Sequence, residues 1–384
     1  MKKEYIIGVD FGYEVTSAWI ISLFDNLCGE SLKLKSTNKE SEKSYYSVIF
    51  SKPNGDYTLD DFQGNKIVGF KDRVSVLDQP QNVQKREAYT AYIKQIYARL
   101  LKHNTILKVD NDGDTNFYLF IAYPTKWSQE DKKAYIQFFN ETLSEFGIEV
   151  MRGINECDAI SYYSYSFLHK QSNKNTLIIN YNASYVEYFV INNGSKNYLG
   201  SRLGLDRVIE ILLDECRKDV DFQETLGYTY SKLSELNIDA IDVMSNIKNE
   251  IKKGVEYSVN YGYYPNLEVN CNLIERQTSY GFTDTFRAEK RKYKFEIDCQ
   301  IDKYIESYKE MLENEFNSID SDNKIDNVII TGHYSSMPWI TEVVEKVFNT
   351  ATIHVDHQGG FAIACGIALF AKQQMKASKT MIHI

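Results

Sequence analysis

The residues with the clearest chemical potential lie near the N-terminus, in the segment GVDFG at residues 8–12. Asp10 ends a strand-like run, and Gly12 follows at the position of a tight turn. A glycine at such a turn lets backbone N–H groups approach a phosphate, and a carboxylate beside it can hold a hydrated magnesium ion. The segment therefore predicts a phosphate clamp, although so short a motif is unspecific by itself.

A second strand-turn-strand pattern occurs in NTLIINYNASYVEYFVIN, residues 175–192, and turns at residues 182–184. The first hairpin, YIIGVDFG followed by VTSAWIISLF, lies near the start of the chain. Two hairpins of one type at a wide separation predict an internal duplication. Two unrelated hairpins are the alternative interpretation.

Strands and helices follow each hairpin in the same order. In the first half we expect a buried strand at 117–124, and a helix that starts at a capping box of Ser128 and Asp131 and stops at Gly147. A strand at 148–154 and a helix at 155–167 come next. The second half repeats the order with strands at 327–332 and 351–355 and helices after each. This alternation predicts an α/β fold with two lobes facing a cleft.

The predicted domain boundaries follow from the same pattern. The N-terminal lobe is residues 1–174, with its core at 1–30 and 105–174 and an inserted outer subdomain at 31–104. The C-terminal lobe is residues 175–384, with its core at 175–205 and 326–384. Its insertion, 206–325, holds long polar helices and two strands, 266–273 and 291–297. A chain of 384 residues is long enough for two cores.

Composition limits the classes of function. The net charge of −9 argues against nucleic-acid or membrane-surface binding. Six cysteines without a C-x-x-C pair fit neither a zinc site nor a disulfide framework and favour a reducing cytoplasm. No run approaches twenty apolar residues, so we expect no membrane span.

Three blocks of sequence resemble one known family. They are 121–161, which keeps Pro124, Gly147, Asn155, Glu156 and Ala159, then VIITGHYSSMPWITEVV at 328–344 and AIACGIAL at 362–369. Together with GVDFG, these blocks are similar to the ATPase domain of the seventy-kilodalton heat-shock chaperones, a branch of the actin-like ATPase superfamily. The resemblance implies a two-lobed actin-like ATPase fold: duplicated mixed-sheet lobes around a nucleotide cleft, each with an inserted outer subdomain.

The resemblance also implies roles for individual residues. Asp10 stands at the family's magnesium-associated aspartate, and Glu156 at the glutamate that orders water and the metal shell. Lys71 stands at a lysine that stabilises the γ-phosphate; an exposed lysine on an outer strand is the alternative. Lys252 and Lys253 resemble a basic pair that packs on adenine and ribose, or they form a solvated helix face.

The phosphate loops depart from the family. Tyr13 and Glu14 follow Gly12, where the family has small hydroxyl residues. Glu14 would repel a polyphosphate if it pointed inward; alternate strand residues face opposite sides, so it could also point outward.

In the second loop, Asn180 replaces an aspartate, and Asn182, Ala183 and Ser184 replace three glycines. An amide cannot act as a general base at neutral pH, and the glycines that allow backbone approach are gone.

The loop that corresponds to the adenosine site has changed as well. It reads Gly332, His333, Tyr334 and then Ser336, so that a histidine replaces a glycine and a serine replaces the arginine that covers the purine. Gly360 stands where the family often has an aspartate. Together these departures predict slow or absent hydrolysis.

Three functions stay open. The first is a chaperone-like protein that binds ATP or ADP with magnesium, weakly or not at all, without efficient hydrolysis; cleft closure would then be its output. The second is a nucleotide-free interaction protein with an unidentified protein partner, in keeping with 29 tyrosines and 20 phenylalanines, which core packing also explains. The third is a small-molecule kinase, for which the second lobe offers no catalytic aspartate. We expect no peptide-binding domain within this chain, because no acidic-hydrophobic linker of the family's kind occurs before its final segment, KQQMKASKTMIHI.

Overall fold

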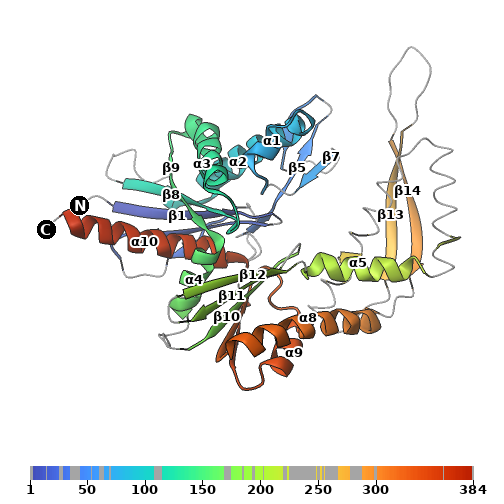
Figure 1. Cartoon of the computed structure of the whole chain (residues 1–384). Coiled ribbons are helices and arrows are strands. Elements are labelled where there is room, and N and C mark those ends of the chain that lie inside the picture. The colour runs from blue at the N-terminus through green and yellow to red at the C-terminus, as the bar shows by residue number, and fades with distance from the viewer. Residues whose placement is uncertain are drawn as a thin grey trace, which may run out of the picture.

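The computed structural model (Figure 1) is a mixed α/β protein with parallel and antiparallel strand pairs. It describes residues 3–13, 15–25, 29–34, 44–52, 54–59, 65–68, 71–107, 115–167, 174–183, 186–192, 195–201, 203–218, 223–224, 248, 251–252, 255, 267–276, 288–297, 301–357 and 359–382. None of the described helices is long and apolar enough to cross a membrane.

The first large sheet is built around the N-terminal hairpin, with strand order β3-β2-β1-β8-β9 and β4 paired with β2. β1 and β2 are antiparallel, whereas β8 and β9 run parallel to β1. Residues Ile7, Val9 and Phe11 point into one core and the intervening residues face the other side, the period-2 alternation that strand geometry imposes. The strands are β1 (Lys3–Phe11), β2 (Val15–Ser22), β3 (Glu30–Ser31), β4 (Ser44–Tyr46), β8 (Thr115–Tyr123) and β9 (Val150–Asn155).

The second large sheet repeats this arrangement strand for strand, with the order β12-β11-β10-β15-β16. Its hairpin is antiparallel, and β15 and β16 run parallel to β10, as β8 and β9 do to β1. The two hairpins thus belong to one arrangement that occurs twice. The strands are β10 (Thr176–Tyr181), β11 (Val186–Asn192), β12 (Ser195–Ser201), β15 (Asn327–Thr331) and β16 (Thr352–Val355).

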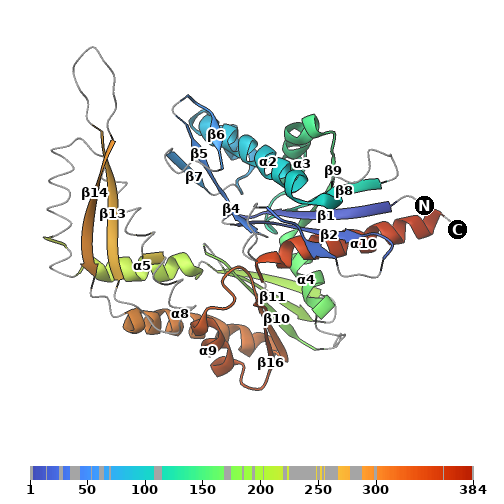
Figure 2. The same cartoon turned by 180° about the vertical axis from the view of Figure 1, so that it is seen from behind.

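Two helices, α4 (Glu156–Phe167) and α10 (Ala362–Ile382), lie between the large sheets (Figures 1 and 2). α10 packs along β1, β2 and β8, although it follows the second half in sequence. α4 follows the first half, yet its Cys157 and Ile160 pack with Ile178 of the second sheet. The helices touch so closely that a Cβ on Gly366 would collide with the backbone of Ala159. Each half therefore supplies a helix to the other half's sheet.

Other helices cover the outer faces of the sheets. In the first half these are α1 (Val74–Leu77), α2 (Val83–His103) and α3 (Gln129–Leu143), beside a small sheet of β5 (Val48–Ser51), β6 (Tyr57–Thr58) and β7 (Asn65–Val68). In the second half they are α5 (Leu205–Cys216), α8 (Ile301–Asn323) and α9 (Pro338–Val347). A long hairpin, β13 (Leu267–Arg276) and β14 (Ala288–Ile297), extends to one side (Figure 1).

The local predictions that the structure describes are confirmed. Ser128 accepts the Asp131 N–H as the N-cap of α3, and Gly147 is left-handed, with φ +66°, at the stop that the sequence indicates. Both hairpins, the strands after them and the two strands of the second insertion form where they were expected, within a few residues.

Candidate functional site

A cavity lies where the turns of the two large hairpins meet the start of α4 and the loop after β15. It is lined by Asp10, Gly12, Tyr13, Val15, Lys71, Glu156, Asn180, Asn182, Ala183, Gly332, His333, Gly360 and Ile363. All of these except Val15 and Ile363 are residues that the sequence predicted for a ligand site. The structure therefore brings together side chains from both hairpins and both halves of the chain.

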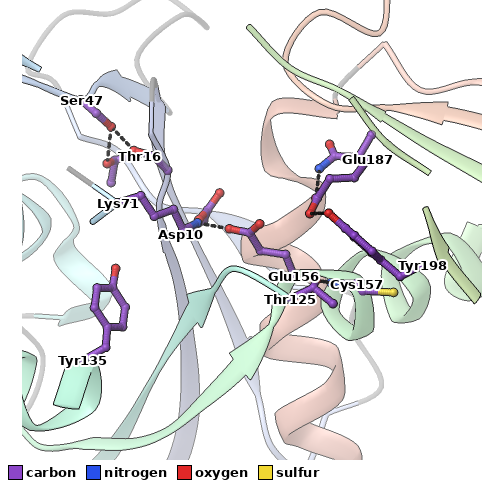
Figure 3. A network of polar contacts seen from close by, with 12 residues as sticks. Asp10, Thr16, Ser47, Lys71, Thr125, Tyr135, Glu156, Cys157, Glu187 and Tyr198 are labelled. Atoms are coloured by element: carbon purple, nitrogen blue, oxygen red, sulfur yellow. Dashed lines mark hydrogen bonds and ion pairs between the residues drawn. The ribbon is translucent and has the colours of Figure 1, made fainter. Parts of the chain in front are cut away.

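Lys71 lies between two acidic residues at the cavity. Its ammonium forms an ion pair with Asp10 at 2.7 Å and another with Glu156 (Figure 3), and the lysine side chain is only 4% exposed. Burial lowers the pKa of Lys71, but the carboxylates of Asp10 and Glu156 outweigh it, so the pKa is raised above its usual value. The alternative of an exposed lysine is wrong, and the site holds a buried cation between two carboxylates.

Side-chain hydroxyl groups form hydrogen bonds that hold the turn of the first hairpin in place. Ser47 donates to the backbone carbonyl of Gly12 at 2.6 Å, and Tyr92 donates to Thr16 at 2.8 Å. Thr16 and Ser47 also contact each other at 3.2 Å (Figure 3). A Cβ on Gly12 would collide with the carbonyl of Val15, so the turn requires glycine. These contacts fix the position of Asp10 at the cavity wall.

A fully buried carboxylate, Glu187, stands next to Asn180 in the second hairpin, and it is not among the site residues predicted from the sequence. The two residues face each other across β10 and β11, and Asn180 donates to Glu187 at 3.0 Å. Tyr198 donates to the second carboxylate oxygen, also at 3.0 Å (Figure 3). An acidic residue seven positions after Asn180 was the available signal, since that spacing makes the two residues partners across the turn.

Burial decides the charge of Glu187. Burial, with a smaller contribution from the nearby Glu156 carboxylate, raises the pKa of Glu187 to about 7, and the hydrogen bonds from Asn180 and Tyr198 offset only part of this effect. The carboxylate does not line the cavity. It accepts a hydrogen bond from Asn180, which does line the cavity, and in this geometry it offers no base to a bound ligand.

Backbone carbonyls of the second hairpin turn accept hydrogen bonds from the start of α5. The N–H groups of Leu205 and Asp206, at the start of α5, donate to the carbonyls of Asn182 at 3.2 Å and Ala183 at 2.7 Å. The N-terminus of a helix would otherwise be a ready anion site, because its first N–H groups lack partners. Here two of them are already bonded to the turn, so this end of α5 is not open to a phosphate.

The far end of the cavity is formed by the loop after β15. Gly332 has φ +103°, and a Cβ there would meet the backbone of Tyr181 and the side chain of Asn180. The next residue, His333, turns its ring toward Gly360; an added Cβ at Gly360 would lie 3.4 Å from Nδ1. Burial and, to a smaller extent, the positive charge of Lys252 lower the pKa of His333 to about 4, so the ring is neutral at neutral pH.

Three predicted residues that the structure describes do not line the cavity. The buried ring of Tyr334 belongs to the core of the second half, and Lys252 lies 5.6 Å from its centroid. Ser336 is exposed and contacts His357 at 3.4 Å. Glu14, Ser184 and Lys253 lie outside the described residues. Of the described residues predicted for the site, Lys252, Tyr334 and Ser336 therefore do not line the cavity.

The cavity differs in charge and in size from what the expected ligands require. Within the described part of the chain, no three His, Cys, Asp or Glu side chains gather as a metal site, and Asp10 already faces the ammonium of Lys71. The residues present do not fit a magnesium ion held directly by protein side chains. The cavity volume of about 50 Å³ accommodates a few water molecules, so a nucleotide would need the walls to move apart.

Comparison of the sequence with models of known protein families and with curated proteins finds no match in either set. The case for a function thus depends on the geometry of the cavity and on the residues that form it.

Proposed function

We propose that this chain is a divergent two-lobed protein of the actin-like ATPase fold, related to the seventy-kilodalton heat-shock chaperones, that binds an adenine nucleotide in this cavity without efficient hydrolysis. One observation carries the proposal: residues chosen from the resemblance, in segments that extend from Asp10 to Gly360, line a single cavity. The matching strand orders of the two large sheets support the same fold.

The proposed mechanism is a change of lobe position rather than chemistry. Lys71 would leave its ion pairs with Asp10 and Glu156 to meet the phosphates, since its raised pKa keeps it cationic. Because the walls of the cavity must move apart to admit a nucleotide, the ligand would favour a wider arrangement of the lobes over the present one, rather than the cleft closure predicted from the sequence. Hydrolysis would be slow, because Asn180 lines the cavity where a base is required and Glu187 lies behind it.

Thermal unfolding with and without Mg-ATP and Mg-ADP tests nucleotide binding. A ligand at a hundred times its dissociation constant adds about 2.7 kcal/mol of stability, which gives a clear rise in Tm. Gly360→Leu should abolish the rise, because its side chain fills the cavity beside His333. Thr352→Leu, on the exposed position of an edge strand, is the matched control and should keep it.

Phosphate release then tests the absence of efficient hydrolysis. We expect turnover slower than about one per minute, far below ordinary enzyme rates. Faster turnover that Gly360→Leu removes would overturn the proposal of a degenerate site, and no shift of Tm at millimolar nucleotide would overturn nucleotide binding.

A second candidate is a nucleotide-independent interaction protein that uses the same fold. The observation in its favour is that the protein's own side chains occupy the cavity: the Lys71 ammonium lies between the two carboxylates, and the His333 ring lies against Gly360. A rigid closed protein would show no shift of Tm with any nucleotide.

A further inference from the structure

The His333 side chain differs from its neighbours in how it is held. It comes from the loop between β15 and α9 and projects into the cavity from the second half. Its ring lies edge-on to Tyr334, with the centroids 4.7 Å apart. Among the described residues, no hydrogen bond or ion pair holds the imidazole, in contrast to Lys71, Asp10 and Asn180 in the same cavity.

The backbone below His333 is tied down. Tyr334 N–H donates to the carbonyl of Tyr181 at 3.1 Å, and Ser335 Oγ donates to the carbonyl of Asp356 at 2.5 Å. The His333 N–H reaches Asn182 Oδ1 at 3.4 Å. The backbone of the loop is therefore anchored on both sides, whereas the imidazole is held only by packing.

The ring limits the space in the cavity. It stands opposite Gly360, where an added Cβ would lie 3.4 Å from Nδ1, at ordinary contact distance. The remaining volume, about 50 Å³, is far below the several hundred Å³ of a small-molecule site. A ligand with a flat ring of its own would have to displace the imidazole.

We propose that His333 is a built-in plug of this cavity and that rotation of its side chain sets the affinity for nucleotide. The inference rests on the proposed function, because it assigns a regulator to the same site. A site that is competent only in a fraction of molecules has its affinity lowered by that fraction. Removal of the plug should therefore strengthen binding.

The test is the dissociation constant of ADP for three variants, measured by calorimetry. His333→Ala should bind about tenfold more tightly than the wild type, because the ligand no longer displaces the ring. His333→Phe keeps a ring in the same space without the nitrogens, and its affinity should not rise above that of the wild type. His354→Ala removes an exposed histidine from β16 and should not change the affinity.

A second measurement follows the ring directly. Burial lowers the pKa of His333 to about 4, so its proton NMR resonances should not titrate near neutral pH in the free protein. With ADP bound, the displaced ring should titrate at a higher pH, and His333→Ala assigns the signal by its loss.

The outcomes separate the two proposals. Tighter binding by His333→Ala but not by His333→Phe supports the plug. Equal affinity of wild type and His333→Ala overturns the plug and leaves nucleotide binding in place. No ADP binding by any of the proteins overturns the proposed function, and the plug with it.

Discussion

Each of the two hairpins at the cavity carries one acidic residue at an equivalent cross-strand pair. The acid lies on the first strand of one hairpin and on the second strand of the other. Asp10 is paired with Ser17 in the first hairpin, and Asn180 is paired with Glu187 in the second, each seven residues apart around the turn. The acid is thus on the inner strand, β1, in the first hairpin and on the neighbouring strand, β11, in the second. The repeated topology preserves the positions while the chemistry changes.

The partners of the acids differ as well. Asp10 has a lysine that comes from beyond the small outer sheet, whereas Glu187 has an amide and a phenol. Burial raises the pKa of Glu187, and the hydrogen bonds from Asn180 and Tyr198, which carry no charge, only partly offset that effect. The first side of the cavity is therefore an ionic network and the second a hydrogen-bonded one.

Removal of the ion pairs of Lys71 should have the largest effect on stability. Lys71→Met leaves two buried carboxylates without a cation and should lower the free energy of unfolding by about 3–5 kcal/mol, measured by urea denaturation. Lys94→Met removes an exposed ion pair with Glu145 and should cost no more than about 1 kcal/mol. Equal losses for the two variants would show that the buried network is not ionic.

The next effect concerns the loop that closes the second side. Gly332→Ala combines a left-handed backbone with a clash against Tyr181 and should cost about 3 kcal/mol. Gly360→Ala meets only Nδ1 of His333, at ordinary contact distance, and should change the stability by less than about 0.5 kcal/mol. If both variants melt at the same temperature, Gly332 is not the constrained position.

Changes to the hydrogen bond between Asn180 and Glu187 should have the smallest effect on stability. Asn180→Asp removes the donor to Glu187 and adds a second buried acid, which should cost about 1–2 kcal/mol at pH 8. Glu187 has a raised pKa in the folded protein, so its contribution to stability is full below its unfolded pKa and lost as pH rises through about 7. The cost of the variant should accordingly be smaller at pH 5.

Two controls sharpen this experiment. The double variant Asn180→Asp with Glu187→Gln exchanges the amide and the acid between the strands and should restore most of the stability. Gln137→Glu places a second acid beside Glu141 on the exposed face of α3, where the change should cost less than about 0.5 kcal/mol. A double variant no more stable than Asn180→Asp would contradict the paired role of these residues.

Much of the fold could be predicted because its signals are local. The period-2 alternation of Ile7, Val9 and Phe11 and the cap at Ser128 depend on neighbours a few residues away. The candidate site could be predicted in part, because Asp10, Gly12 and Asn180 end strands whose hairpins were recognisable. Glu187 was missed, because its relation to Asn180 becomes visible only with the register of β10 and β11.

The strands, the turns and the order in which they repeat could thus be predicted from the amino-acid sequence, since they follow from side-chain periodicity and backbone freedom. Which charges meet depends on the packing of distant segments. Lys71 lies 61 residues from Asp10 in the chain, and its pairing with Asp10 and Glu156 requires the outer sheet and α4 to be in place. The exchange of α4 and α10 between the halves and the direction of the His333 ring are likewise set by packing between segments far apart in sequence.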